Sequence, residues 1–149
     1  MDFNVEDLAI RVINYHSEEY RKELELRDEV LRKPLGMSLF DENLEKEKMD
    51  IHIGAFVKNK LVGVLILTPL NLSDIKMRQV AVLETTRSQK VGSQLVQFAE
   101  EYAKDKGYAL MRLNARKTAV GFYEKLGYEK IGEEFFEIKI PHFRMNKIL

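Results

Sequence analysis

Hydrophobic and polar residues alternate along much of this chain, and the period of the alternation predicts its elements. Residues 51–57 and 61–67 are rich in β-branched and apolar side chains and are separated by residues 58–60, a pattern typical of a β-hairpin. A third run of the same kind covers residues 75–83. We therefore expect three consecutive antiparallel strands.

The third run contains a break in its alternation. Ile75 and Met77 point to one face, but the next apolar pair, Val80 and Val82, resumes one residue out of step. A β-bulge near residues 78–79 would bring both pairs to the same face. Because a bulge re-aims backbone groups, it predicts a gap in the sheet where an extended ligand can lie between two strands.

Helical spacing marks three other segments. Residues 17–33 carry apolar side chains on one side, residues 91–103 show an apolar stripe that Gly107 ends, and residues 118–126 show a shorter one that Gly127 ends. The first segment also has four pairs of opposite charge at a spacing of four residues, namely Glu18/Lys22, Glu23/Arg27, Asp28/Arg32 and Glu29/Lys33. Pairs of this kind favour a helix.

The remaining strands complete the order of elements. Alternation predicts a first strand within residues 3–15, a strand at 108–113, and a closing pair at 128–138 and 140–148. A strand–helix–strand unit of this length implies a parallel crossover. We predict an α+β fold with a mixed, mostly antiparallel sheet, in a single domain over residues 1–149.

Composition narrows the class of protein. The chain has 149 residues, 45% of them hydrophobic, which is enough for one domain that buries about 68–70% of its unfolded surface. Cysteine is absent, which excludes disulfides, thiolate zinc sites and a cysteine nucleophile and favours a cytoplasmic location. His16 and His52 lie far apart with no helix-spaced partner, so we expect no metal.

The charges balance. Lysine plus arginine and aspartate plus glutamate both number 24, so no net field gathers nucleic acid or an anionic membrane. The longest apolar run, residues 61–67, is too short to cross a bilayer, and the acidic N-terminus lacks the character of a signal peptide. We expect no nucleic-acid partner and no membrane partner.

Residues 80–95 carry the clearest chemical signal, because an apolar strand passes through a short polar turn into an amphipathic helix. The first N–H groups of a helix have no intrahelical partner, and the positive end of the helix dipole lies beside them. Residues 87–93 could therefore wrap a pyrophosphate, which points to a phosphorylated cofactor.

Two motifs here resemble those of the GNAT superfamily of acyl-CoA-dependent N-acyltransferases. The family's pyrophosphate loop, R/Q-x-x-G-x-G/A, is similar to residues 87–92, Arg-Ser-Gln-Lys-Val-Gly. The family's second segment, N-(x)n-A-x-x-F-Y-x-x-x-G-F/Y, is similar to the set formed by Asn114, Ala119, Phe122, Tyr123, Gly127 and Tyr128. One position departs from the pattern: Lys90 stands where the family usually has its first glycine, and we expect it to take helical backbone angles and change a contact rather than remove the site.

The resemblance implies a GNAT-like arrangement, with helices on both faces of the sheet and a central parallel pair, the strands at 80–82 and 109–113, that splays around the cofactor. It implies acetyl-CoA (coenzyme A) as co-substrate, with the pantetheine arm paired to the backbone of Val80 and Val82. The residues that it implies bind this cofactor are Val80, Ala81, Val82, Arg87, Ser88, Gln89, Lys90, Val91, Gly92, Ser93, Asn114, Phe122 and Tyr123.

The resemblance also implies the catalytic groups. In the family, a backbone N–H at the position of Val80 stabilises the oxyanion, and a tyrosine at the position of Tyr123 protonates the departing thiolate. Considered without the motif, Tyr123 is more typical of a core tyrosine on a short helix. A base must also take a proton from the incoming ammonium; the candidates are Glu84, Glu133, Glu134 and His142, and the sequence assigns none of them.

We therefore predict an N-acetyltransferase that moves an acetyl group directly to a primary amine of a small-molecule or peptide acceptor. One alternative is a non-catalytic acyl-CoA-binding or sensing module, marked by Lys90; another is an interaction domain that uses the helix at 17–33. Residues 41–49 form either a cover over one end of the site or a solvated connection. Charges are balanced in the segments 31–50 and 133–142, which favours neither a cationic nor an anionic acceptor. Many relatives form homodimers, which the resemblance permits.

Overall fold

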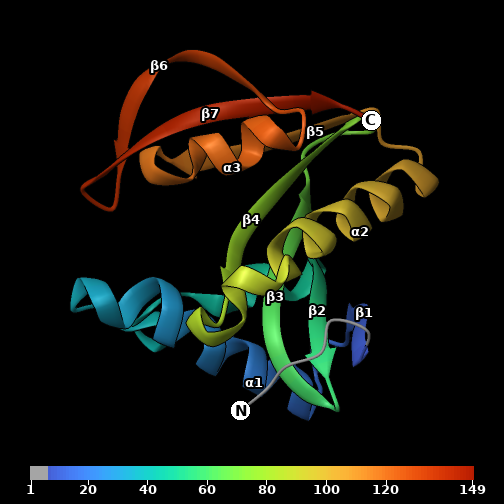
Figure 1. Ribbon diagram of the computed structural model, residues 1–149, viewed down its shortest axis with the longest axis vertical. Helices are drawn as coiled ribbons and strands as arrows, with labels where there is room; N and C mark the ends of the chain where they lie inside the picture. The colour runs from blue at the N-terminus through green and yellow to red at the C-terminus, as the bar shows by residue number, and fades with distance from the viewer. Residues whose placement is uncertain (1–6) are drawn as a thin grey trace.

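A computed structural model describes residues 7–149, apart from the side chains of residues 87–89. Within this range one mixed sheet has the strand order β1-β2-β3-β4-β5-β7-β6 (Figure 1). The strands are β1 (Leu8–Ile13), β2 (Ile51–Val57), β3 (Lys60–Pro69), β4 (Asp74–Val82), β5 (Leu110–Arg116), β6 (Glu129–Glu137) and β7 (Ile140–Ile148). The β4–β5 pair is parallel and the other neighbours are antiparallel, which confirms the predicted fold class.

Helices cover both faces of the sheet. The α-helices are α1 (Glu18–Arg27), α2 (Val91–Asp105) and α3 (Val120–Lys125). Shorter helical turns are the π-helical η2 (Asp28–Arg32) and the 3₁₀ turns η3 (Lys33–Leu35), η4 (Leu39–Asp41), η5 (Leu44–Met49), η6 (Glu84–Gln89) and η7 (Lys117–Ala119). One core lies between the sheet and α2 with α3, and a second lies between the sheet and α1.

Both predicted hairpins form, and each closes on a two-residue turn; the first turn is one residue shorter than the predicted separation of 58–60, because Lys60 already pairs with Val57. Lys58 and Asn59 have φ of 50° and 67°, and Ile138 and Lys139 have φ of 51° and 62°. Positive φ at both central positions gives a turn whose twist matches that of the strands it joins. The second hairpin places β7 between β5 and β6.

The first predicted helix is correct in place but not in regularity. Of the predicted charge pairs, Glu23–Arg27 forms at 3.0 Å. Asp28 instead accepts a hydrogen bond from the Leu39 N–H at 2.8 Å, and Arg32 pairs with Glu42 at 2.6 Å. Because these partners come from the segment that follows, the helix passes into the π turn η2 and the 3₁₀ turn η3.

The strand predicted at 108–113 begins and ends later than expected. Gly107, with φ of 95°, ends the turn after α2, and the Tyr108 N–H still bonds to the Ala103 carbonyl at 3.0 Å. Pairing with β7 then carries β5 on to Arg116. This extension matters, because the last residues of β5 line the site.

Candidate functional site

The sheet opens between β4 and β5. Their parallel register runs from Asp74 opposite Leu110 to Met77 opposite Leu113 and stops there, although both strands continue. The diverging ends are residues 78–82 and 114–116. The predicted splay therefore exists, but 109–113 belongs mostly to the paired part, because the strand is shifted along the sequence.

A β-bulge lies on β4 at the start of the opening, as the break in alternation predicts. Ile66 faces Arg78 and Val64 faces Ala81, so one residue of β3 stands against two of β4. Gln79, one of these two, has φ of 55°. Val80, the other, has no residue in register on β3 and lies beyond the pairing with β5.

A cavity of about 900 Å³ fills the opening and reaches both faces of the sheet. On the α2 and α3 face its wall includes Lys90, Gly92, Ser93, Gln97, Phe122, Tyr123 and Lys125; on the opposite face it includes Val30, Leu31, Arg32, Arg78, Asn114 and Arg116. Val80, Ala81 and Val82 lie along the edge between the two. The opening thus connects two sides that the rest of the sheet separates.

The predicted anion loop leads into α2. Lys90 has φ of 62° and ψ of 22°, so the expected helical angles are wrong: the residue is left-handed, because it joins the 3₁₀ turn η6 to α2. The Lys90 side chain does not cap the first N–H groups of α2, and Gly92 and Ser93 line the cavity beside them. Val91 is fully buried in the core. The side chains of Arg87, Ser88 and Gln89 lie outside the described residues.

Tyr123 lies in the wall of the cavity, on α3, with 7% of its surface exposed. Its ring packs edge to face with Phe122 at 5.0 Å and with Tyr128 at 5.7 Å between centroids. Burial raises its pKa well above the usual value of 10, so the hydroxyl group is protonated at neutral pH and can donate a proton. Asn114, across the opening, donates from Nδ2 to Glu137 Oε2 at 3.2 Å.

Of the four candidate bases, the structure brings His142 to the cavity. His142 is buried, and its Nδ1 donates to the Ile140 carbonyl at 2.7 Å, which leaves Nε2 to accept a proton in the neutral ring. Glu84, Glu133 and Glu134 are exposed and do not line it. Residues 41–49 do not line it either, and they pack against α1 through Glu47.

Sequence analysis missed the three arginines of the cavity wall. They are Arg32 on η2, Arg78 on β4 and Arg116 on β5. The signal available was the alternation in β5, where Arg112, Asn114 and Arg116 occupy the positions between the buried Met111, Leu113 and Ala115. That alternation places Arg116 on the α1 face, but only the fold shows that η2 and β4 bring further arginines there.

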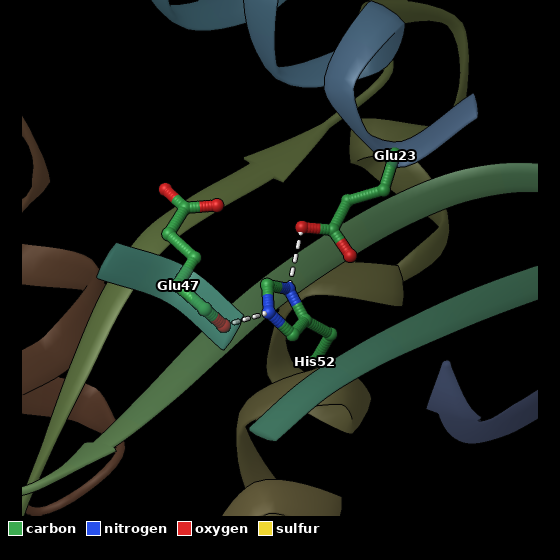
Figure 2. Close-up of side chains that lie close together, drawn as sticks. All are labelled: Glu23, Glu47 and His52. Atoms are coloured by element: carbon green, nitrogen blue, oxygen red, sulfur yellow. Dashed lines mark hydrogen bonds and ion pairs between the residues drawn. The ribbon is translucent and has the colours of Figure 1, made fainter. Parts of the chain in front are cut away.

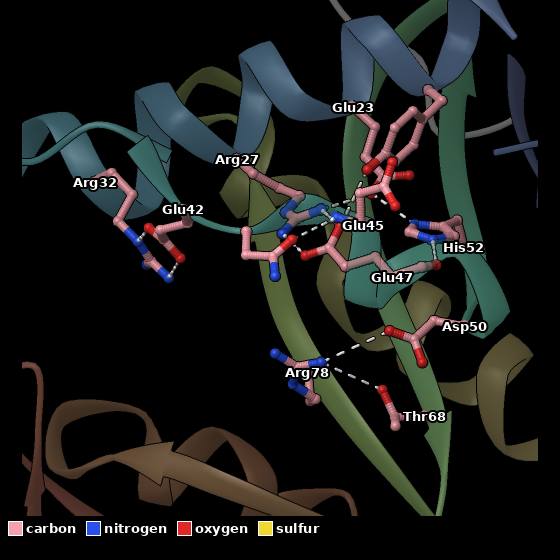
Figure 3. Close-up of polar contacts among 12 residues, drawn as sticks. Glu23, Arg27, Arg32, Glu42, Glu45, Glu47, Asp50, His52, Thr68 and Arg78 are labelled. Carbon is pink, nitrogen blue, oxygen red and sulfur yellow. Dashed lines mark hydrogen bonds and ion pairs between the residues drawn. The ribbon is translucent and has the colours of Figure 1, made fainter. Parts of the chain in front are cut away.

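A buried polar cluster lies beside the site, under α1. Glu23, Glu47 and His52 offer ligand atoms within 4.8 Å of one another, and Figure 2 shows His52 between Glu23 and the Glu47 carbonyl. The Arg27 guanidinium supplies positive charge to both carboxylates, because it donates to Glu47 at 2.6 and 2.7 Å and to Glu23 at 3.0 Å (Figure 3). These contacts make the cluster a buried ion network.

Comparison with known proteins gives consistent matches. The sequence profile of the family described as "Acetyltransferase (GNAT) domain" matches residues 16–149. YjcF of Bacillus subtilis, described as an uncharacterized N-acetyltransferase, is 32% identical over 139 residues, which cover 91% of this chain and 97% of that protein. A match to YyaT of the same organism is 38% identical and spans 48% of this chain and about half of that protein, 49%.

The fold of this chain is also similar to that of proteins with solved structures. The crystal structure of an aminoglycoside 6'-N-acetyltransferase complexed with coenzyme A is similar with a TM-score of 0.78, at 18% identity, over 94% of this chain and 96% of that chain. Likeness at this level of identity concerns the fold. Across residues 7–149, no helix combines the length and apolar composition needed to span a bilayer.

Proposed function

Because the chain belongs to the GNAT acetyltransferase family, we propose that it transfers an acetyl group from acetyl-CoA directly to a primary amine. The observation that carries this proposal is the opening between β4 and β5, with the bulge at Gln79 and Val80 on one side and Tyr123 on the other. An opening of this kind lets a thioester and an amine meet inside the sheet.

The α2 and α3 side of the opening suits acetyl-CoA. The first N–H groups of α2, which the Lys90 side chain does not cap, offer a site for a pyrophosphate. A Cβ atom at position 92 would lie 3.4 Å from Phe122, so glycine keeps this part of the wall open. The similar structure that holds coenzyme A supports the same assignment.

The proposed reaction is nucleophilic attack of the amine nitrogen on the thioester carbon. The new C–N bond forms, the C–S bond breaks, and the thiolate leaves. The Val80 N–H would donate to the carbonyl oxygen as it gains negative charge, and the Tyr123 hydroxyl would protonate the thiolate. The incoming ammonium first gives a proton to His142 Nε2, directly or through water, because only the neutral amine can attack.

Thiol release from acetyl-CoA tests the proposal. The full chain is assayed against a panel of small amines, polyamines, amino acids and peptides, and release that depends on the amine is expected. Silence across the panel beside clear binding of CoA in titration calorimetry would favour a non-catalytic binding module. Absence of CoA binding would favour an interaction domain.

A further inference from the structure

The α1 face of the cavity is strongly basic. Arg32, Arg78 and Arg116 line it from three different elements, and Glu137 is the one acidic residue among the described residues of the whole cavity wall. The balanced charge of the whole sequence therefore does not extend to the residues that line the cavity.

Two of the three arginines have carboxylate partners. Arg32 Nε donates to Glu42 at 2.6 Å, and Arg78 lies 3.7 Å from Asp50 and donates to the Thr68 hydroxyl oxygen at 3.4 Å (Figure 3). These contacts account for much of the positive charge of both guanidinium groups, and hold Arg32 in particular in a fixed position.

Arg116 differs, because it has no carboxylate partner among the described residues. Its Nη2 donates to the Leu31 carbonyl oxygen at 3.4 Å, and Arg32 donates to the same oxygen at 3.3 Å. Partial burial and the charge of Arg32 lower the pKa of Arg116. A half-buried cation that shares one neutral acceptor with a second cation is a place where a bound anion would be favourable.

The phosphate groups of acetyl-CoA do not account for this charge. Their proposed site at Lys90, Gly92 and Ser93 lies on the α2 face, whereas Arg116 points to the α1 face, as its contact with Leu31 on η2 shows. The Arg116 guanidinium, which has no carboxylate partner among the described residues, therefore faces the side from which the acceptor would enter.

We propose that the acceptor amine also carries an anionic group, a carboxylate or a phosphoryl group, which Arg116 binds. This inference rests on the proposed acetyl transfer. The register of the sheet fits it, because Arg116 lies directly opposite His142 on β7, so the anion site and the proposed base share one face. An acceptor with its amine and its anion a few bonds apart spans the two.

Acceptor preference is the direct test. Rates of thiol release from acetyl-CoA are measured for matched pairs: glycine, leucine and glutamate, each beside its own carboxamide, and O-phosphoethanolamine beside ethanolamine. We expect kcat/KM to be higher for the anionic member of at least one type of pair, by about 10- to 100-fold. The carboxylate pairs and the phosphoryl pair distinguish the two kinds of anion.

A variant ties the preference to the residue. Arg116→Gln should lower kcat/KM for the anionic member far more than for the neutral member, while Arg116→Lys should restore part of the advantage of the anionic member. Arg112→Gln is the matched control, since Arg112 lies on the same strand, pairs with Asp74 at 2.8 Å and does not line the cavity. A preference for neutral amines, or an equal loss for both members in Arg116→Gln, would overturn the inference and leave acetyl transfer standing.

A second experiment distinguishes failure of the proposed acetyl transfer from failure of the proposed anion site. If no acceptor releases thiol, the proposed function fails. Calorimetry with CoA present still tests the anion site, because it compares the binding of an acid with that of its neutral analogue. The two pairs are N-acetylleucine with N-acetylleucinamide, and N-acetylated O-phosphoethanolamine with N-acetylethanolamine. Tighter binding of an acid that Arg116→Gln abolishes would support the site. Equal binding of acid and neutral analogue, or no binding of either, would contradict it.

Discussion

Lys90 holds a backbone conformation that its side chain disfavours. The left-handed region costs a residue with a Cβ roughly 1–2 kcal/mol, whereas glycine enters it freely. Lys90→Gly should therefore raise the free energy of unfolding by up to about 1 kcal/mol, since the greater flexibility of glycine in the unfolded chain offsets part of the gain. Urea denaturation of the two proteins measures the difference.

Lys22→Gly is the control for this change. Lys22 is exposed and lies in the middle of α1, where the same substitution should cost about 1 kcal/mol. Opposite signs at the two positions are expected. A loss of stability at both would mean that Lys90 is not strained.

Tyr123 carries the chemical prediction at the residue scale. Tyr123→Phe removes a hydroxyl group to which no described residue hydrogen-bonds, so packing and CoA affinity should change little. Under the proposed mechanism kcat should fall by about 100-fold or more, because the thiolate loses its proton donor. Steady-state kinetics and calorimetry with CoA separate the two effects.

Tyr128→Phe serves as the matched variant, because Tyr128 packs against Tyr123 but does not line the cavity. Its kinetic constants should stay close to those of the unchanged protein. Equal losses of rate and of CoA affinity in Tyr123→Phe would assign Tyr123 a packing role.

His52 is the residue whose charge the structure defines best. Its Nδ1 lies 2.8 Å from Glu23 Oε2 and its Nε2 lies 3.0 Å from the Glu47 carbonyl, and because both partners are acceptors, both ring nitrogens must be donors. Burial acts to lower the pKa of His52, but the hydrogen bond and charge of Glu23 outweigh it, so the pKa is raised above 6.5. The folded protein therefore favours the imidazolium form of the ring more than a free histidine does.

This raised pKa predicts how stability depends on pH. A group with a higher pKa in the folded state contributes stability that is fully present below pH 6.5 and is lost as the pH rises through the folded pKa. The free energy of unfolding should therefore fall above pH 6.5 more steeply than in His52→Gln, which should itself be destabilised by about 1–3 kcal/mol below that pH. The charged and titratable groups around His52 are Tyr15, Tyr20, Glu23, Arg27 and Glu47.

Urea denaturation across the pH range measures this effect, with His16→Gln as the control, because His16 is exposed. The control should keep the pH dependence of the unchanged protein. Parallel stability profiles for His52→Gln and the unchanged protein would contradict a raised pKa.

At the scale of elements, the period of the apolar residues predicts most of the fold. It places both hairpins, α2 and the bulge on β4, because each of these is set by local turn chemistry or by which face of a strand is buried. It misplaces β5, whose length depends on pairing with β7, a strand distant in the sequence.

The local sequence pattern also fails to predict that Glu23 and Arg27 are buried. Four residues apart on a helix, they look like a solvated pair, yet both are fully buried, because η5 and β2 bring Glu47 and His52 against them. The arginines of the cavity wall are hidden in the same way, since η2, β4 and β5 meet only in the folded sheet. The cofactor side stays a prediction, and it could be made from local pattern because its loop lies within one strand–turn–helix unit.

The contact between α2 and α3 gives a prediction for elements. Gly92 on α2 faces the Phe122 ring on α3, and a larger side chain would project into the cavity between them. Gly92→Leu should weaken CoA binding by about tenfold or more, as expected for a steric cost of about 1–3 kcal/mol. Calorimetry with CoA measures the loss.

Gly121→Leu is the comparison, because a Cβ atom at Gly121 on α3 meets nothing within 4 Å. Its affinity for CoA should be unchanged. Normal binding by a folded Gly92→Leu variant would place the pyrophosphate elsewhere.

At the scale of the whole molecule, the sheet separates two cores, and it also separates the proposed cofactor side of the cavity from the proposed acceptor side. The core under α2 and α3 is almost wholly apolar, whereas the core under α1 has a network of buried charges beside it. Removal of one partner from such a network costs more than removal of an exposed pair, because the remaining charges stay buried. The α1 face is thus held by polar contacts whose geometry also fixes η2, and with it Arg32.

The opening that passes through the sheet has a kinetic consequence. Two reactants that approach from opposite faces never have to pass one another, so neither must depart before the other arrives. Under the proposed activity, double-reciprocal plots at several fixed concentrations of amine should intersect, because both reactants occupy the protein together, and parallel lines would indicate that CoA leaves before the amine binds, with the acetyl group held covalently on the protein.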